Sequence, residues 1–373
     1  MPEGKGPFRA DHVGSLQRPK SLLDARARFK AGEISAEELR ATENEAIAGA
    51  VRMQEEIGLR SITDGEYRRE NFHFDFLDKV GGVDFRRMMP EGAEGKSADP
   101  EKAPFVAYIT DRLSRPDSGI EVENYKVVAG LTDRTPKITI PSPTMTHFRG
   151  GRAAIDRTAY PDLDDFFADL ARVYREELAG LAAAGCRYVQ FDDTNLAYLC
   201  DENMRESTRK LGEDPDALPA TYAALINDTI RERPDDMAVC IHMCRGNAQS
   251  QWFASGGYEA IAEKVFSLTK VDGFFLEYDD ERSGGFEPLR FVPKGPDGPR
   301  VVLGLLTTKR GELEPRAEIL QRIEEASRYV DIGQLCLSPQ CGFSSNAVGN
   351  LITVDEQIRK LRTIVEIAEE VWG

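Results

Sequence analysis

The sequence has 373 residues, of which 41% are hydrophobic, and its 64 acidic and 48 basic residues give a net charge of −16. A chain of this length buries a large core, and its acidic surface argues against nucleic acid or an anionic membrane as a partner. The N-terminal residues have no apolar segment typical of a secretory signal, and no apolar run is long enough to span a membrane. We therefore expect a cytoplasmic protein with reduced cysteines.

The first half of the sequence contains three strand-like runs, at residues 8–13, 60–63 and 137–140. A long helical stretch covers residues 20–57, and its second part opens at Ser35 with the Ser-x-x-Glu pattern of a capping box. These features predict helices between the first two strands.

Residues 73–135 interrupt this pattern, because they are rich in glycine, proline and charged side chains. A long insertion inside a domain is usually functional or disordered. We expect it to lie between strands two and three and to form an extra hairpin over the mouth of the fold.

The second half alternates regularly between strands and helices. Its near-continuous apolar runs are typical of strands buried on both faces, and they cover residues 186–191, 237–242, 273–278, 301–306 and 334–338. Amphipathic helical patterns occur at residues 163–184, 216–231, 257–269, 314–329 and 354–371.

Eight strands that mostly alternate with helices predict an α/β fold of the (β/α)8 TIM barrel type, forming a single domain over residues 1–373. The alternative is a doubly wound open sheet. However, no GxGxxG motif follows the first strand, as a dinucleotide site in such a fold would require.

His242 and Cys244 close the strand predicted at 237–242. Residues two apart on a strand point to the same side, and the carboxyl end of a barrel strand faces the active site. An imidazole and a thiol presented together suit Zn²⁺.

Two further candidate ligands, Glu277 and Cys341, follow later strands. With His242 and Cys244 they predict a four-residue zinc site in which the carboxylate is the ligand most easily displaced. The alternatives are buried core thiols, a hydrogen-bonded core histidine, and pairing of Glu277 with Arg282 or Arg245. The other cysteines are assigned to packing: Cys186, Cys200, Cys240 and Cys336.

Polar residues also follow other strands at the same end of the fold. His12 and Ser15 follow strand one, Glu66 follows strand two and Asp192 follows strand four. Acids here suit an ammonium group, and Ser15 with nearby backbone N–H groups suits a carboxylate. These residues predict an amino-acid substrate site, and the alternative is a set of ordinary loop caps.

Several motifs resemble those of the cobalamin-independent methionine synthase family, in particular its short single-barrel branch, over nearly the whole chain. They are TDGEYRREN (63–71), QFDDTNLAYLC (190–200), HMCRGN (242–247), LEYDDERSGGFEPLRF (276–291) and LCLSPQCGF (335–343). The resemblance implies zinc bound by the HxC pair, by the glutamate of the motif at 276–291 and by the cysteine of the motif at 335–343. These residues match His242, Cys244, Glu277 and Cys341. It also implies a homocysteine site that includes Ser15, Glu66 and Asp192.

The implied reaction is attack of a homocysteine thiolate, formed on zinc, on the methyl group of 5-methyltetrahydrofolate or its polyglutamate. The family's aromatic folate platform falls within residues 140–144, where this chain has no tryptophan. Its acid histidine falls near Lys309, which we expect to protonate the leaving amine. The same branch resembles epoxyalkane:coenzyme M transferase, but the acids Glu66 and Asp192 favour an amino-acid thiol over a sulfonate. The sequence leaves the oligomeric state open, a homo-oligomer included.

Overall fold

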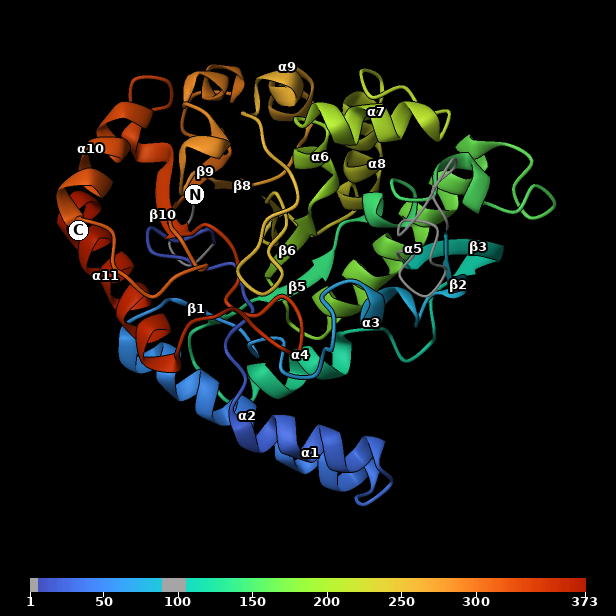
Figure 1. The fold of residues 1–373 in the computed structure, drawn as a ribbon, viewed down its shortest axis with the longest axis horizontal. Helices are drawn as coiled ribbons and strands as arrows, with labels where there is room; N and C mark the ends of the chain where they lie inside the picture. Colours follow the sequence, from blue (N-terminus) through green and yellow to red (C-terminus); the bar gives the residue numbers. More distant parts are fainter. Residues whose placement is uncertain (1–5, 89–104) are drawn as a thin grey trace, which may run out of the picture.

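The computed structural model describes residues 6–88 and 105–373. Within these ranges, a six-stranded parallel sheet with the order β10-β9-β8-β7-β6-β5 forms the centre of the molecule (Figure 1). Its strands are β5 (Ile138–Pro141), β6 (Tyr188–Asp193), β7 (Ala238–Met243), β8 (Gly273–Glu277), β9 (Arg300–Leu306) and β10 (Leu335–Pro339). Each overlaps a run predicted from the sequence, so the α/β fold with a parallel sheet is confirmed.

A separate two-stranded parallel pairing lies next to the start of β5 in the chain. Strand β1 (Ser61–Ile62) pairs with β4 (Thr135–Pro136), and the backbone N–H of Lys137 donates to the Ile62 carbonyl over 2.8 Å. Because β4 leads directly into β5, β1 lies beside the chain that begins the six-stranded sheet.

The N-terminal segment lies along the other edge, beside β10. The N–H of Asp11 donates to the Leu337 carbonyl over 3.0 Å, and the Leu337 N–H donates to the Arg9 carbonyl over 2.8 Å. Further along, the Leu16 N–H donates to the carbonyl of Gly65, just after β1, over 3.0 Å. The segment from Arg9 to Leu16 thus connects β10 with the chain around β1.

The prediction of a regular strand over residues 8–13 is wrong, because only a single bridge, from Ala10 to Leu337, forms there. The Asp11 carboxylate accepts the backbone N–H groups of Phe8, over 3.0 Å, and His12, over 2.8 Å. Side-chain bonds of this kind compete with a strand ladder for the same backbone donors.

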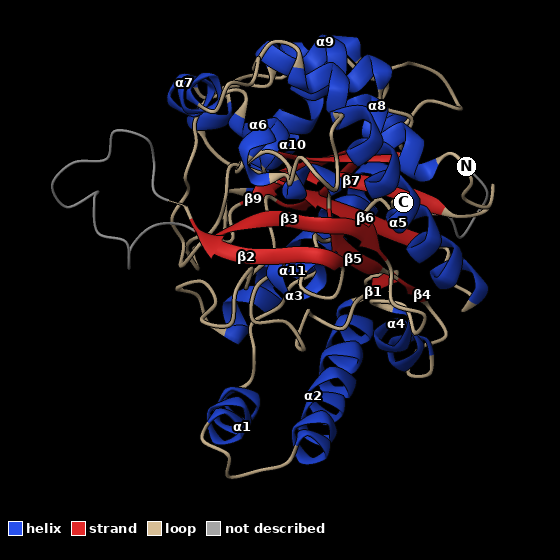
Figure 2. Ribbon diagram, turned by 90° about the vertical axis from the view of Figure 1, so that its right-hand side faces the viewer, coloured by secondary structure: helices blue, strands red, loops and turns tan. Residues whose placement is uncertain are grey.

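Helices lie on both sides of the strands (Figure 2). They are α1 (Lys20–Lys30), α2 (Ala36–Ile57), α3 (Phe74–Leu77), α4 (Val122–Ala129), α5 (Leu163–Ala183), α6 (Asn195–Tyr198), α7 (Glu202–Lys210), α8 (Leu218–Ile230), α9 (Glu259–Leu268), α10 (Arg316–Ala326) and α11 (Val354–Trp372). Short 3₁₀ turns are η3 (Pro143–Thr146), η4 (Gly151–Ala154), η5 (Glu281–Ser283), η6 (Glu287–Phe291) and η7 (Ile332–Gln334). The capping box predicted at Ser35 is confirmed at the start of α2. None of the helices in the described ranges has the length and apolar character needed to span a membrane.

The predicted hairpin in the insertion is confirmed by antiparallel strands β2 (Gly81–Arg87) and β3 (Phe105–Ser114). Phe74 packs against Phe85 and Phe105 of the hairpin, with ring centroids 4.8 and 6.4 Å apart. Arg112 of β3 forms an ion pair with Asp169 of α5. The hairpin therefore packs on α5 and on the chain around α3, while residues 89–104 lie outside the described residues.

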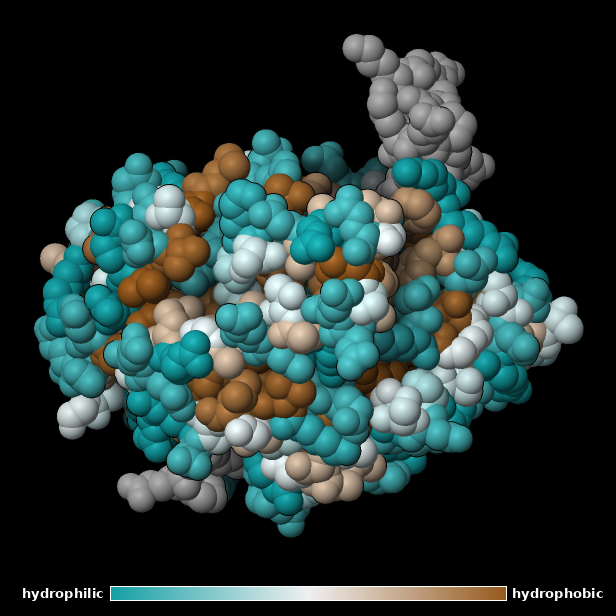
Figure 3. All heavy atoms as spheres, turned by 90° about the horizontal axis from the view of Figure 1, so that it is seen from below, coloured by the Kyte–Doolittle hydropathy of each residue, from teal (hydrophilic) through white to brown (hydrophobic). Residues whose placement is uncertain are grey.

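The sheet separates two hydrophobic clusters. Alternate residues such as Val239 and Ile241 of β7 belong to the large cluster under the helices. Ala238 and Cys240 belong to a small cluster on the opposite face, together with Phe275. The outer surface seen in Figure 3 is mainly hydrophilic with separate hydrophobic patches, in keeping with the acidic composition.

Candidate active site

A cavity that is partly open to solvent lies at the carboxyl ends of the strands. Asp192 at the end of β6, His242 in β7 and Cys341 after β10 line it. The residues predicted from separate strand ends thus meet in one space, as expected for parallel strands.

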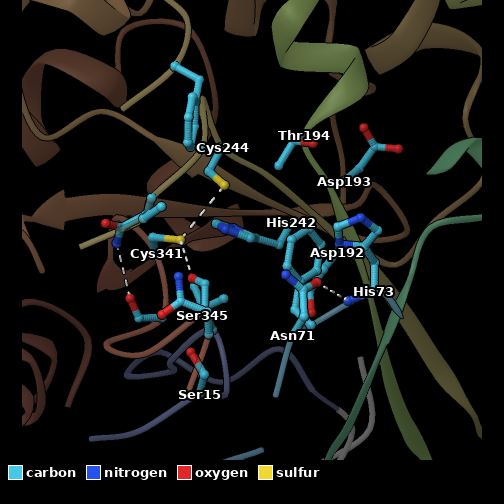
Figure 4. A pocket seen from close by; sticks show the side chains of 18 of the residues that line it. Ser15, Asn71, His73, Asp192, Asp193, Thr194, His242, Cys244, Cys341 and Ser345 are labelled. Carbon is cyan, nitrogen blue, oxygen red and sulfur yellow. Dashed lines mark hydrogen bonds between the residues drawn. The ribbon is translucent and has the colours of Figure 1, made fainter. Parts of the chain in front are cut away.

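His242, Cys244 and Cys341 place one ligand atom each within 4.8 Å of one another. All three side chains are buried, and Figure 4 shows them directed toward each other. Neither ring nitrogen of His242 has a hydrogen-bond partner among the described residues. Burying an imidazole in this way costs about 1–3 kcal/mol, which a metal bound by one nitrogen would offset. The group fits zinc, which favours nitrogen and sulfur ligands.

Strand β7 explains why His242 and Cys244 face the same way. Cys240, two residues before His242, packs in the small inner cluster, so the side chains at 240, 242 and 244 follow one face of the strand. The Sγ atoms of Cys244 and Cys341 lie 3.7 Å apart. The hydrogen bond from Cys244 lowers the pKa of Cys341 well below its usual value.

Glu277, at the end of β8, lies next to this group but is bound by cations. Its Oε1 accepts hydrogen bonds from Arg282 over 2.5 Å and from Lys309 over 3.2 Å, and its Oε2 accepts the backbone N–H of Arg245 over 2.5 Å. Burial opposes ionisation, but the charges of Lys309, Arg245 and Arg282 outweigh it and lower the pKa of Glu277. The pairing with Arg282 considered from the sequence is therefore observed, and the role of Glu277 as fourth ligand stays a prediction.

Lys309 does not line the cavity. Its Nζ donates to Asp279 over 2.8 Å and to Glu277 over 3.2 Å. Burial lowers the pKa of Lys309, but Glu277 and Asp279 outweigh this and raise it. Lys309 is thus a protonated side chain held by two carboxylates, and these bonds would have to break before it could donate a proton to a substrate.

Glu66 and Asp192 line the cavity together and are both buried. Glu66 has a positive φ of 59°, which is uncommon for a residue with a side chain and is often found at functional sites. Its carboxylate accepts a hydrogen bond from Thr139 over 2.9 Å, and that of Asp192 accepts one from Gln190 over 2.6 Å. Burial raises the pKa of Glu66 to about 7 and that of Asp192 to about 6. A ligand with an ammonium group would favour the ionised form of both.

Ser15 lies in the same cavity, at the point where the N-terminal segment meets the turn after β10. Its Oγ accepts the backbone N–H of Ser344 over 3.3 Å. A Cβ atom on Gly342 would lie 2.0 Å from this oxygen, so only glycine allows the turn to approach so closely. Gly342 therefore keeps Cys341 and Ser15 on adjoining walls.

His12 is the predicted substrate-binding residue that the structure places away from the cavity. Its Nε2 lies 3.3 Å from the carbonyl oxygen of Ser61. Burial and the nearby charge of Lys137 lower the pKa of His12 to about 4, so the ring is neutral. The next residue, Val13, lines the cavity instead.

Several lining residues were not singled out from the sequence: Asn71, His73, Phe74, Arg149, Tyr198 and Phe253. A signal for Arg149 existed, because it follows the strand at 137–140 and so belongs to the same edge as the other strand ends. His73 was less visible, because it lies at the start of the irregular insertion.

A family model described as the catalytic domain of cobalamin-independent synthase matches residues 8–370. The uncharacterized protein YxjH of Bacillus subtilis (strain 168) is 46% identical over 370 residues, which cover 99% of this chain and 96% of the relative. The methionine synthase of Pyrococcus horikoshii is 24% identical over 356 residues, which cover 93% and 92% of the two chains. A crystal structure from Listeria monocytogenes matches with a TM-score of 0.79 and 40% identity, over 99% of both chains. The chain therefore belongs to the cobalamin-independent synthase catalytic-domain family, as a methionine synthase-like methyltransferase.

Proposed function

We propose that the protein is a zinc-dependent thiol methyltransferase that methylates homocysteine from 5-methyltetrahydrofolate, or its polyglutamate, to give methionine. The observation that carries this proposal is the group of one imidazole and two thiols within 4.8 Å, in the same cavity as two buried carboxylates. The similarity to the methionine synthase of Pyrococcus horikoshii supports the choice of substrate.

His242, Cys244 and Cys341 would hold the metal, with Glu277 as the fourth ligand. Bound zinc supplies a positive charge that lowers the pKa of a substrate thiol, so that thiolate is present near neutral pH. Glu277 is near enough for its charge to affect the pKa values of Cys244 and Cys341. Arg282 and Lys309 donate hydrogen bonds to this carboxylate and would hold it in place beside the metal ligands.

The chain's own residues would orient the amino acid. Glu66 and Asp192 would accept hydrogen bonds from the ammonium group of the amino acid, and the Ser15 hydroxyl would donate a hydrogen bond to its carboxylate. With both ends of the amino acid held there, its side chain extends toward His242 and Cys341 on the neighbouring wall. Holding the nucleophile in one orientation is the main rate advantage that such residues supply.

We also propose that the strands close into a (β/α)8 barrel within one catalytic domain. The bridge between the N-terminal segment and β10, and the pairing of β1 with β4, support this closure. A closed barrel would bring the ends of β6, β7, β8 and β10 around one opening.

The activity is tested by incubating zinc-loaded protein with homocysteine and a panel of alkyl donors, followed by mass spectrometry of the products. We expect methionine to form when methyltetrahydrofolate is the donor. We expect the rate of methionine formation to be higher with the polyglutamate form of this donor. The panel includes methylcobalamin, and coenzyme M with an epoxide, to test the related transferase reaction. No methionine from methyltetrahydrofolate or its polyglutamate would contradict the proposal.

A further inference from the structure

The cavity has a second half that the proposed homocysteine site does not use. His73 lies across the pocket from Cys341 in Figure 4. With it, Asn71, Phe74 and Arg149 line the cavity, and none of them is among the residues assigned to the amino acid. Since a methyl transfer needs two substrates, this half is the space left for the second one.

Arg149 brings a positive charge to this wall. Its side chain is half-buried and lines the cavity, and no hydrogen bond or ion pair joins it to another residue of the ranges 6–88 and 105–373. The arginines near the metal ligands differ in this respect, because Arg245 and Arg282 both pair with Glu277. Arg149 therefore has its hydrogen-bond donors available for a ligand.

His73 provides a second, independent feature. Its side chain is 3% exposed, and neither ring nitrogen has a hydrogen-bond partner among the described residues. The rings of Phe72 and Phe74 lie 4.5 and 4.0 Å from the imidazole, and Asn71 accepts the His73 backbone N–H over 3.1 Å. Burial and the charge of Arg149 lower the pKa of His73 well below its usual value. The result is a fixed, neutral imidazole whose N–H has no partner in the protein.

Tyr198 lines the same cavity as Arg149 and Cys244. Burial raises the pKa of its hydroxyl, and the charges of Arg149 and Cys244 are both near enough to affect it. The flat part of a ligand bound at Arg149 would contact the aromatic side chains of Phe74 and Phe253, which also line the cavity.

We propose that Arg149 and His73 form a binding subsite for a carboxylate of the methyl donor. Arg149 would pair with the carboxylate through two N–H groups, and His73 would donate its ring N–H to the same group. This inference rests on the proposed function, since it assigns the anionic group to the second substrate and not to homocysteine.

The test measures binding without turnover, with 4-aminobenzoylglutamate, an aromatic dicarboxylate, as the probe. Calorimetry on zinc-loaded protein compares Arg149→Ala, Arg149→Lys and His73→Phe with wild type. Arg157→Ala is the matched control, because Arg157 is an exposed arginine nearby that does not line the cavity. We expect Arg149→Ala to weaken probe binding about 10-fold or more, with smaller losses for the other two cavity variants and none for the control. The neutral diester of the probe should bind wild type weakly.

Homocysteine binding to the same variants decides which substrate the subsite serves. We expect Arg149→Ala to leave homocysteine affinity unchanged. Equal probe affinity in wild type and Arg149→Ala, a wild type that does not bind the probe, or a loss confined to homocysteine would each overturn the subsite. Failure of the proposed function would give a different result. Wild type would then bind the probe but would form no methionine from methyltetrahydrofolate.

Discussion

Single residues at the cavity have roles that follow from their surroundings more than from their type. Cys341 and Cys336 are both buried cysteines near β10, yet Cys336 packs in the inner hydrophobic cluster and Cys341 faces His242 and Cys244. Burial raises the pKa of Cys336 to about 11, whereas the hydrogen bond from Cys244 lowers that of Cys341. Of these two cysteines, Cys341 is therefore the one placed to bind a metal, together with His242 and Cys244.

Replacing Cys341 by serine should reduce bound zinc from about one ion per chain to a small fraction, because a hydroxyl is a poor zinc ligand. Elemental analysis of purified wild type and variant measures this directly. Cys200→Ser is the control, since Cys200 lies in the chain after α6 and outside the cavity. Equal zinc in wild type and Cys341→Ser would remove Cys341 from the site.

Glu66 predicts a pH dependence of amino-acid binding. Its pKa is about 7, so the carboxyl is largely protonated at pH 6 and largely ionised at pH 8. Methionine carries the same ammonium group as homocysteine but no ionising thiol, and its Kd should rise about 10-fold as the pH falls from 8 to 6. Calorimetry across this range tests it. Glu66→Gln should bind methionine more weakly with a flatter profile, and the same slope in both proteins would assign the titration elsewhere.

At the scale of elements, local sequence signals set the ends of helices, and packing sets where those helices lie. Helix α11 begins at a capping box formed by Thr353 and Glu356. One residue further on, Gln357 accepts the backbone N–H of Gln17 over 2.8 Å, which ties the helix to the N-terminal segment. A loss of the cap should therefore affect the stability of the fold around β10.

Thr353→Ala should lower the free energy of unfolding by about 1 kcal/mol, because it removes the side-chain acceptor of the Glu356 N–H. Chemical denaturation of wild type and variant measures the change. The matched control is Thr363→Ala in the middle of the same helix, where alanine is the better helix former and no loss is expected. A similar decrease in both variants would show that the cap is not the cause.

At the scale of the whole molecule, a buried ion pair joins distant segments under the cavity. Lys137 lies 3.3 Å from the Asp11 carboxylate, and both side chains are fully buried. The same carboxylate accepts hydrogen bonds from Tyr188 over 2.8 Å and Ser61 over 2.7 Å. The ammonium group also lies 4.3 Å from the ring centroid of Phe275. The contacts of Lys137 and Asp11 thus join several segments: the N-terminal segment, β1, the start of β5, β6 and β8.

Lys137→Met should destabilise the fold by about 3–5 kcal/mol, because it leaves Asp11 buried without its cation. Thermal and chemical denaturation measure the loss. Lys126→Met is the control, since Lys126 pairs with Glu123 on the surface, where such pairs contribute about 1 kcal/mol or less. Equal stability of the two variants would show that the buried pair does not hold these segments together.

The sequence by itself determined the elements and most of the candidate ligands of this protein. Buried strands, helix periodicity and the capping box at Ser35 are local patterns, so they could be read without knowing the fold. The spacing of His242 and Cys244 is also local, because a strand sends alternate side chains to one face. The places of Cys341, Glu66 and Asp192 just after predicted strands singled these residues out as well, and the family motifs agree with them.

Only the tertiary structure decided which partners those side chains have. Glu277 turned out to be bound by Arg282 and Lys309, and His12 to face away from the cavity. Arg149 and His73 come from different segments of the chain, and the fold places both of them in the lining of one cavity. Contacts between residues so far apart in the chain depend on how the elements pack and on which charged groups compete for each partner. Local sequence patterns contain no information on these two factors.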